Sequence, residues 1–248
     1  FDQPGLRGSA GCGLTIEFMR AAKRPRMERI VRPRFGGNMA EKVTIGNAEL
    51  WHGDCREVLP LLTPADLIVT DPPYGIGYAA QPIVGKGKKA SNHERKAWDD
   101  EVPPAWLFGL MQEKAKQLVI WGGNYYDLPQ TRGWLSWFKP DAPPSMGNFE
   151  LAWTSFDRPA RQLSVSIGET NPERVGHPTQ KPLRLIEWCV GSAPGAKTCI
   201  DPFMGSGTTG VACVRLGLHF IGIERERKYF DIACRRIEDE QRQCRLAV

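Results

Sequence analysis

Short apolar segments alternate with longer amphipathic ones along the chain from Val43 onwards. Apolar runs bounded by Gly, Pro, Asn and Asp predict strands, and the amphipathic stretches between them predict helices. This alternation is typical of an α/β protein with a mostly parallel, here seven-stranded, sheet that helices cover on both faces. The predicted strands are 43–54, which also has the pattern of a hairpin, 66–70, 117–123, 134–139, 151–156, 197–203 and 219–224, and the predicted helices are 55–62, 103–116, 182–193, 206–217 and 226–244.

The composition is that of one globular domain. With 248 residues, 41% of them hydrophobic, the chain is long enough to bury one sizeable core. It contains neither an apolar run of the roughly 18 residues that a membrane span requires nor the start of a signal peptide. The seven cysteines are scattered without a CxxC pair, which predicts reduced thiols and neither a disulfide framework nor a metal site.

The positive charge of the chain is concentrated at its N-terminal end. Residues 1–38 contain eight basic and three acidic residues, which accounts for the whole net charge of +5, because the remaining 25 basic and 25 acidic residues cancel. Overall charge therefore gives little support to nucleic-acid binding by the rest of the chain. We expect a basic, disordered extension over 1–38 and one folded domain over 39–248, which begins at Met39. A role of the extension in holding an acidic polymer is the alternative.

Two long segments, 79–100 and 141–176, interrupt the alternation of strands and helices. Loops of this length inside a compact domain are more often functional than incidental, so both are candidate contact regions for DNA. The first suits contacts with phosphate groups, although a solvated mobile loop has the same composition. Its basic residues are Lys86, Lys88, Lys89, Arg95 and Lys96.

The sequence DPFMGSGTTG at 201–210 has the composition of a ligand-binding turn between a strand and a helix. Its glycines allow the backbone to approach a nucleotide-like ligand closely. GSGTTG also fits the GxGxxG pattern of dinucleotide sites, which is a weak indication on its own. Asp201 would repel a pyrophosphate but suits a ligand with an ammonium and a sulfonium charge, such as S-adenosylmethionine. Glu224, which ends the next strand, suits ribose hydroxyls, and a tight turn without a ligand is the structural alternative.

The sequence TDPPYG, around 71–74, ends another strand and suits a planar amino group. Two prolines fix the backbone, so the Asp71 carboxylate and the Pro72 carbonyl are held as neighbouring acceptors. Tyr74 offers a ring face on which a base can stack, worth about 1 to 3 kcal/mol. Two fixed acceptors favour an amino nitrogen whose lone pair attacks a methyl group, by positioning and electrostatics alone. A base within a duplex reaches such a pocket only when it is flipped out.

Together, the two strand exits resemble the DNA amino-methyltransferases, which modify N6 of adenine or N4 of cytosine. DPPY at 71–74 precedes DPFMGSGT at 201–208, which is the motif order of the β class. The resemblance covers Val43 to Cys244 and implies a Rossmann-like, SAM-dependent methyltransferase fold with circularly permuted motif order. It also implies S-adenosyl-L-methionine as the cofactor and double-stranded DNA as the partner. About twenty residues remain for a recognition region before 177, as in short, phage-type members.

Three further segments agree with this resemblance. HPTQKP at 177–182 is similar to the segment that flanks the methionine end of the cofactor, and HGDCREVLPLL at 52–62 to the segment in which Asp54 meets its adenine amino group. IWGGNYY at 120–126 is similar to the strand beside the target-base pocket. The implied catalytic residues are Asp71, Pro72, Pro73 and Tyr74, and the implied cofactor-binding residues are Asp54, His177, Thr179, Lys181, Asp201, Phe203, Gly205, Ser206, Gly207, Thr208 and Glu224.

The resemblance favours adenine N6 as the target, because DPPY usually accompanies adenine, whereas cytosine enzymes usually carry serine in place of the aspartate. N4-cytosine methylation is the first alternative, since both reactions use an exocyclic amine. A nicotinamide-dependent dehydrogenase and a non-catalytic DNA-binding protein are more remote alternatives. The resemblance implies site-specific methylation in the cytoplasm of a bacterium or a phage-infected cell, either in restriction–modification or as an orphan enzyme. The sequence leaves open the recognition site, a paired nuclease, and a monomeric or homodimeric state.

Overall fold

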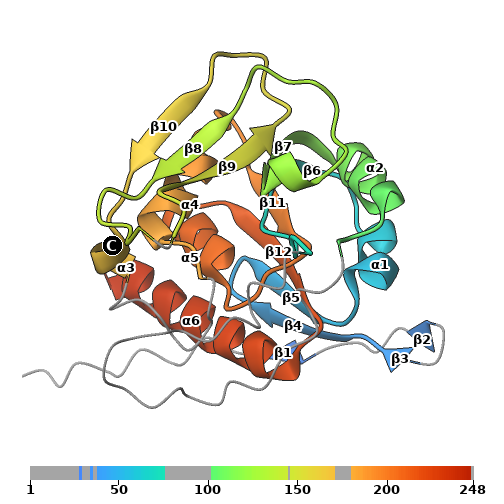
Figure 1. Cartoon of the computed structure of the whole chain (residues 1–248). Helices are drawn as coiled ribbons and strands as arrows, with labels where there is room; N and C mark the ends of the chain where they lie inside the picture. Colours follow the sequence, from blue (N-terminus) through green and yellow to red (C-terminus); the bar gives the residue numbers. More distant parts are fainter. Residues whose placement is uncertain are drawn as a thin grey trace, which may run out of the picture.

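The computed structural model of the chain describes residues 28–29, 34–35, 38–75, 102–144, 146–170 and 180–246. They form a ten-stranded sheet with helices on both faces and a separate two-stranded ribbon (Figure 1). The sheet strands are β1 (Glu28–Arg29), β4 (Glu41–Ile45), β5 (Ala48–His52), β6 (Ala65–Thr70), β7 (Ala115–Trp121), β8 (Leu135–Phe138), β9 (Phe149–Thr154), β10 (Arg161–Ser164), β11 (Thr198–Asp201) and β12 (His219–Glu224); the ribbon is β2 (Arg34–Phe35) with β3 (Asn38–Met39). The helices are α1 (Cys55–Val58), α2 (Ala105–Lys114), α3 (Ile167–Thr170), α4 (Leu183–Gly191), α5 (Thr208–Arg215) and α6 (Arg227–Leu246), with 3-10 turns η1 (Leu59–Leu61) and η4 (Gly123–Tyr125).

The centre of the sheet is parallel and its edges are antiparallel. The strand order is β1-β4-β5-β12-β11-β6-β7-β9-β8-β10, and the five strands from β5 to β7 run parallel to one another. Antiparallel pairs extend the sheet through β4 and β1 at one edge and through β9 and β8 at the other, where β10 lies parallel to β8. Central parallel strands are buried on both faces, which explains the nearly continuous apolar runs in β6 and β12.

The chain changes direction across the sheet between β6 and β11. From β6 it passes through α2 to β7 on one side, and from β11 it passes through α5 to β12 on the other. In open α/β sheets, the loops that follow two such strands diverge and leave a crevice at the carboxyl ends of the strands. Asp71 follows β6 and Asp201 ends β11, so both strand exits identified in the sequence flank this crevice.

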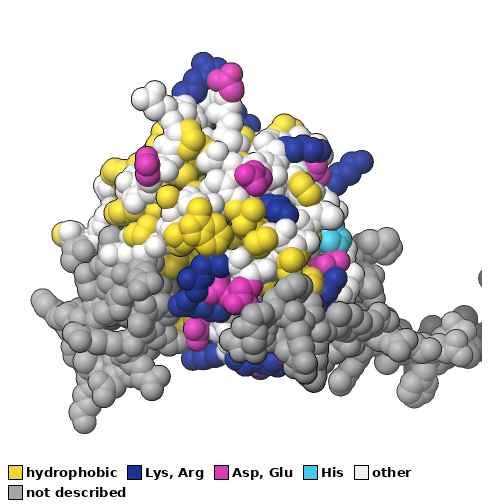
Figure 2. Space-filling view, turned by 90° about the vertical axis from the view of Figure 1, so that its right-hand side faces the viewer, with side chains coloured by type: hydrophobic (Ala, Val, Ile, Leu, Met, Phe, Trp, Pro, Cys, Tyr) yellow, Lys and Arg dark blue, Asp and Glu magenta, His cyan; other side chains and the backbone are white. Residues whose placement is uncertain are grey.

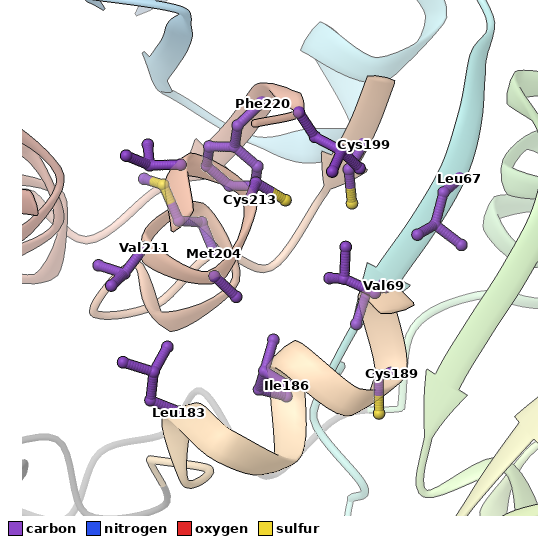
Figure 3. Close-up of a cluster of buried hydrophobic side chains, with 14 of the residues drawn as sticks. Leu67, Val69, Leu183, Ile186, Cys189, Cys199, Met204, Val211, Cys213 and Phe220 are labelled. Carbon is purple, nitrogen blue, oxygen red and sulfur yellow. The ribbon is translucent and has the colours of Figure 1, made fainter. Parts of the chain in front are cut away.

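Two apolar clusters cover the two faces of the sheet. Leu67 and Val69 of β6 belong to the cluster beneath α4, α5 and α6, whereas Ile68 belongs to the cluster beneath α1, η1 and α2 (Figure 1). This is the alternation that a strand between two helix layers requires. Figure 3 shows part of the first cluster, to which α4 contributes Leu183 and Ile186 and α5 contributes Val211. Burial of these side chains supplies the main favourable term in folding.

The prediction of seven strands is wrong, and the extra strands have identifiable causes. Residues 43–54 form the hairpin β4–β5, with Gly46 at a φ of 59° in its two-residue turn. Two strands of the sheet, β1 and β10, were not predicted, and neither were the ribbon strands β2 and β3. The sequence of β10, RQLS, lacks apolar alternation because this edge strand is largely exposed and pairs only with β8.

The segment 141–176 is not a continuous loop, because it contains β9, β10 and α3. Asp141 supports the start of α3, since its carboxylate accepts hydrogen bonds from the backbone N–H groups of Ile167 (2.7 Å) and Gly168 (2.9 Å). Within 1–38, the described residues form β1, β2 and the first residue of β3. The basic loop 79–100 lies outside the described residues, so its contact with DNA stays a prediction.

In the described part of the chain, no helix combines the length and the apolar character that a membrane crossing requires. Six cysteines of this part are free, and five of them are buried. The same residues contain no group of three or more His, Cys, Asp or Glu side chains arranged to hold a metal ion.

The N-terminus of α5 depends on a glycine. Gly207 precedes the helix with a φ of 83°, and a Cβ atom added there would lie 2.8 Å from the Cβ atom of Ala233 in α6. Real Cβ atoms do not approach so closely, and a left-handed backbone strains any residue with a side chain. Gly207 therefore permits both the turn and the close packing of α5 on α6.

We predict that Gly207→Ala lowers the free energy of unfolding by about 2 to 4 kcal/mol, from backbone strain and overpacking together. Gly109→Ala is the matched control, because Gly109 lies within α2 and an added Cβ atom there meets nothing within 4 Å. This control substitution should leave the free energy of unfolding unchanged or raise it by up to about 1 kcal/mol. Urea unfolding followed by circular dichroism measures both, and equal effects of the two substitutions would contradict the prediction.

Candidate functional site

A cavity of about 220 Å³ lies at the carboxyl edge of the sheet, in the crevice between β6 and β11. It brings together most of the residues that the sequence predicted to act, from five separate segments of the chain. Its wall reaches the surface at Val102, which precedes α2 and is 46% exposed. Figure 2 shows the face of the molecule on the side of α1 and α2, where apolar side chains form a band above a group of Lys, Arg, Asp and Glu side chains. The predicted residues that line the cavity are Asp54, Asp71, Pro73, Lys181, Asp201, Phe203, Gly205, Ser206, Thr208 and Glu224.

Asp201 supports the glycine turn with its carboxylate. It is 3% exposed and accepts hydrogen bonds from the hydroxyls of Thr70 (2.8 Å) and Thr209 (2.7 Å) and from the backbone N–H of Phe203 (3.1 Å). Burial raises the pKa of Asp201 to about 6, and these hydrogen bonds oppose the rise. Asp201 therefore joins β6, β11 and α5, in addition to bordering the cavity.

The glycine turn is also held from outside, by α6 and by the segment before α4. The Arg236 guanidinium donates from Nη1 to the backbone carbonyl (2.8 Å) and the hydroxyl (3.1 Å) of Ser206 and to the hydroxyl of Thr208 (3.1 Å). The Ser206 hydroxyl in turn donates to the side-chain carbonyl of Gln180 over 3.3 Å. The backbone of the turn is thus fixed before a ligand arrives.

Glu224 presents a half-buried carboxylate to the cavity. Its oxygens accept hydrogen bonds from the backbone N–H groups of Gly205 (2.9 Å) and Glu226 (2.7 Å). Burial raises the pKa of Glu224 to about 7; the carboxylates of Glu226 and Asp201 add to this rise, and the two backbone hydrogen bonds oppose it. Each carboxylate oxygen has a second lone pair, so Glu224 can still accept hydrogen bonds from a ligand.

Asp54 caps α1 and forms an ion pair with the neighbouring Arg56. The carboxylate accepts from the backbone N–H of Arg56 (2.8 Å) and is bound by the guanidinium through Nε (3.0 Å) and Nη2 (2.5 Å). Burial alone would raise the pKa of Asp54, but the hydrogen bonds from Arg56 outweigh it and leave the pKa below its usual value. Asp54 is therefore an ionised acceptor whose contact with Arg56 the sequence did not indicate.

The Asp71 carboxylate lies between Tyr74 and Lys181. Oδ1 accepts from the Tyr74 hydroxyl over 2.6 Å, and Oδ2 accepts from the Lys181 ammonium over 2.7 Å. The ammonium also lies 3.1 Å from the Tyr74 hydroxyl oxygen and 3.1 Å from Oε2 of Glu150. Burial raises the pKa of the Tyr74 hydroxyl well above its usual value, and Asp71 and Glu150 raise it further. Tyr74 is thus a neutral hydrogen-bond donor to Asp71.

The two prolines of DPPY are positioned by the segment after β7. The Tyr126 hydroxyl donates to the backbone carbonyls of Pro72 (2.9 Å) and Pro73 (3.1 Å). The Tyr74 ring stacks on the ring of Tyr125, with 5.1 Å between centroids and 20° between planes. Gly122 makes room for it, because a Cβ atom there would lie 2.2 Å from the Tyr74 ring. Residues 120–126 therefore lie beside DPPY, next to the cavity.

Several residues that complete the site were not named from the sequence. Arg236 acts through contacts with a segment far away in the chain. Tyr125 and Tyr126 lie in the segment 120–126, which the resemblance placed beside the target-base pocket, but their contacts with the DPPY segment are visible only in the structure. Lys139 and Glu150 carried a signal that was available: both are charged residues at the ends of strands that are otherwise apolar. His177 and Thr179 lie outside the described residues, so their contact with a cofactor stays a prediction.

The chain matches known DNA methylases in sequence. Residues 120–235 match the family model for DNA methylase of the N6/N4 type. The chain is 24% identical over 243 residues to the Type II methyltransferase M2.MboI of Moraxella bovis, a match covering 78% of this chain and 88% of that protein. It is 51% identical over 65 residues to the Type II methyltransferase M2.DpnII of Streptococcus pneumoniae, but that match covers only 26% of this chain and 24% of the relative.

Solved structures of DNA methyltransferases have a similar fold. The M1.HpyAVI–SAM complex superposes with a TM-score of 0.52 at 25% identity, over 76% of this chain and 99% of that one. The cytosine-N4-specific PvuII DNA methyltransferase superposes with a TM-score of 0.51 at 18% identity, over 81% of this chain and 92% of that one. These similarities confirm the Rossmann-like α/β methyltransferase fold that the sequence predicted.

The pKa of Glu224 predicts how stability depends on pH. Because folding raises this pKa from near 4.5 to about 7, the folded state binds a proton more tightly than the unfolded state, and stability falls as the pH rises through this range. We expect Glu224 to contribute a loss of roughly 3 kcal/mol in the free energy of unfolding between pH 4.5 and 8.

Glu224→Gln should remove this part of the pH dependence, whereas the exposed Glu57→Gln should retain it. Urea unfolding at a series of pH values gives the slope for each protein. Parallel curves for the wild type and Glu224→Gln would contradict the prediction.

Proposed function

We propose that this chain, which matches the family model for N6/N4 DNA methylases over residues 120–235, transfers a methyl group from S-adenosylmethionine to the exocyclic N6 of an adenine flipped out of double-stranded DNA. One observation carries the proposal: the DPPY segment and the glycine turn border the same cavity. Asp71 and Pro73 lie on one wall, and Gly205, Ser206 and Thr208 lie on another. A methyl donor bound at the glycine turn therefore faces a target base bound at Asp71.

The residues around the turn fit a nucleoside with a cationic side chain. S-adenosylmethionine supplies the methyl group in this family, on a sulfonium that makes it a good leaving group. Glu224 offers two carboxylate oxygens to the ribose hydroxyls, and Phe203, Leu107 and Ile223 give the cavity apolar surface for a purine ring. Asp54, ionised beside Arg56, offers an acceptor for the amino group of that ring.

The acceptor side works by positioning. Asp71 accepts a hydrogen bond from the amino group of the target base, and the Pro72 carbonyl, held by Tyr126, accepts the second. Both bonds favour a pyramidal nitrogen whose lone pair points at the methyl carbon. Tyr74 contributes stacking of about 1 to 3 kcal/mol once the base replaces its neighbour Tyr125. The rate enhancement comes from orientation and fixed charges.

Adenine is the preferred target because the acceptor at position 71 is an aspartate, as in the adenine-specific relatives that DPPY resembles. The same two acceptors serve the N4 amino group of cytosine equally well, since both nitrogens are conjugated to a ring. The two bases differ in ring size and not in the chemistry of the reacting nitrogen. The identity of the methylated nucleoside therefore tests this choice directly.

We predict that incubation with methyl-labelled S-adenosylmethionine and unmethylated bacterial DNA puts the label into N6-methyladenine. Digestion to nucleosides and chromatography with mass detection identify the product. Label in N4-methylcytosine would show that the target base is cytosine and not adenine. Absence of label in any DNA, together with binding of NADH but not of S-adenosylmethionine, would overturn the proposal in favour of a dehydrogenase.

We also predict that Asp71→Asn lowers kcat by about 100- to 1,000-fold, because the amide replaces a charged acceptor at the reacting nitrogen. The affinity for S-adenosylmethionine, measured by isothermal titration calorimetry, should stay within about twofold. Asp157→Asn is the matched control, since Asp157 is exposed and pairs only with Arg132 among the described residues. Full activity of Asp71→Asn would show that Asp71 does not touch the reacting group.

A further inference from the structure

Lys181 holds a buried ammonium whose three protons all have acceptors. Its side chain is 7% exposed, and Nζ lies 2.7 Å from Oδ2 of Asp71, 3.1 Å from the Tyr74 hydroxyl oxygen and 3.1 Å from Oε2 of Glu150. The rings of Tyr74 and Trp121 flank it, with their centroids 5.6 Å and 5.4 Å from Nζ. An ammonium has three donors. Lys181 would therefore lose one of these bonds if it turned toward a carboxylate of the cofactor.

The ion pair continues away from the cavity. Oε1 of Glu150 accepts from the ammonium of Lys139 over 2.5 Å, and Lys139 is 5% exposed and lies over the ring of Trp137. Two cations and two carboxylates thus alternate, in the order Lys139, Glu150, Lys181 and Asp71, from β8 through β9 to the exit of β6. Burial alone would lower the pKa of Lys181, but Asp71 and Glu150 together raise it above its usual value, so Lys181 stays charged.

This arrangement fixes both groups that the proposed reaction needs on the acceptor side. The ammonium contacts the Asp71 carboxylate and the Tyr74 hydroxyl at once, and those two groups also bond to each other over 2.6 Å. Without the ammonium, the carboxylates of Asp71 and Glu150 would have no cation between them. Like charges in a buried site repel, so Asp71 would turn away from the orientation that meets the base.

We propose that Lys181 is a positioning residue that orients the Asp71 carboxylate and the Tyr74 ring for methyl transfer, and that Glu150 and Lys139 hold Lys181 in place. This inference rests on the proposed function and assigns Lys181 to the acceptor side of the site. Its effect is on kcat, because a misplacement of about 1 Å in the reacting groups costs roughly 100-fold in rate. The binding of S-adenosylmethionine is not involved.

The test compares Lys181→Met, Lys181→Arg and Glu150→Gln in the full chain. With saturating S-adenosylmethionine, Lys181→Met should lose about 100-fold in kcat, while the Kd for S-adenosylmethionine stays within about twofold. Lys181→Arg retains the charge and should recover at least tenfold of that loss, although its fork does not reproduce the three contacts of an ammonium. Glu150→Gln, an isosteric change, should lower kcat about tenfold.

Lys116→Met is the matched control, because Lys116 is 77% exposed and pairs with Asp66 away from the cavity. It should leave kcat unchanged. A Lys181→Met protein with wild-type kcat and a Kd for S-adenosylmethionine raised tenfold would overturn the inference and make Lys181 a cofactor ligand. A Lys181→Arg protein as slow as Lys181→Met would also overturn it, because shape rather than charge would then be the requirement.

A second measurement separates this inference from the proposed function. The free energies of urea unfolding of Asp71→Asn, Lys181→Met and the double variant form a cycle that needs no activity. We expect the two effects to be clearly non-additive, as for directly paired charges. A wild-type protein that transfers no methyl group would contradict the proposed function. Additive effects of the two substitutions on the free energy of unfolding would contradict the role of Lys181.

Discussion

The burial of negative charge at the carboxyl edge of the sheet shapes the whole site. Five carboxylates border one cavity, and four of them, all except the exposed Glu226, are buried or half-buried. A carboxylate removed from water is costly unless donors or cations compensate it. Two of the four are stabilised by neutral donors and keep raised pKa values, and two are stabilised by cations. Asp201 accepts hydrogen bonds from two threonine hydroxyls and a backbone N–H, and Glu224 accepts from two backbone N–H groups. Asp54 is bound by the Arg56 guanidinium. Asp71 is bound by the Lys181 ammonium and the Tyr74 hydroxyl.

The segment before α4 connects the two halves of the site. Gln180 accepts a hydrogen bond from Ser206 in the glycine turn, and its neighbour Lys181 donates to Asp71 at the exit of β6. Two consecutive residues thus contact the walls on which donor and acceptor are proposed to bind. Because Pro182 follows them and precedes the first turn of α4, their backbone is held by a helix that packs into the core. The relative position of the two walls is therefore set by the core.

The sequence was a good guide where local chemistry decides and a poor one where distant segments meet. The parallel centre of the sheet, the five predicted helices and the clustering of Asp71, Asp201 and Glu224 follow from apolar periodicity and from acids at strand ends. The edge strand β10 was missed because exposure removes the apolar alternation on which prediction depends. The residues that brace the site from distant segments, such as Arg236 at the glycine turn, are determined by contacts in space, which no pattern along the chain specifies.

The contact between Arg236 and the glycine turn also has a consequence for the order of synthesis. The turn at 204–208 and the DPPY segment leave the ribosome before α6 does, yet the carbonyl of Ser206 and the hydroxyl of Thr208 are bound only by that later helix among the contacts described above. Gly207 likewise packs against Ala233 of α6. A nascent chain thus contains its DPPY segment long before its glycine turn is braced, so the turn reaches its final geometry only after α6 has been synthesised.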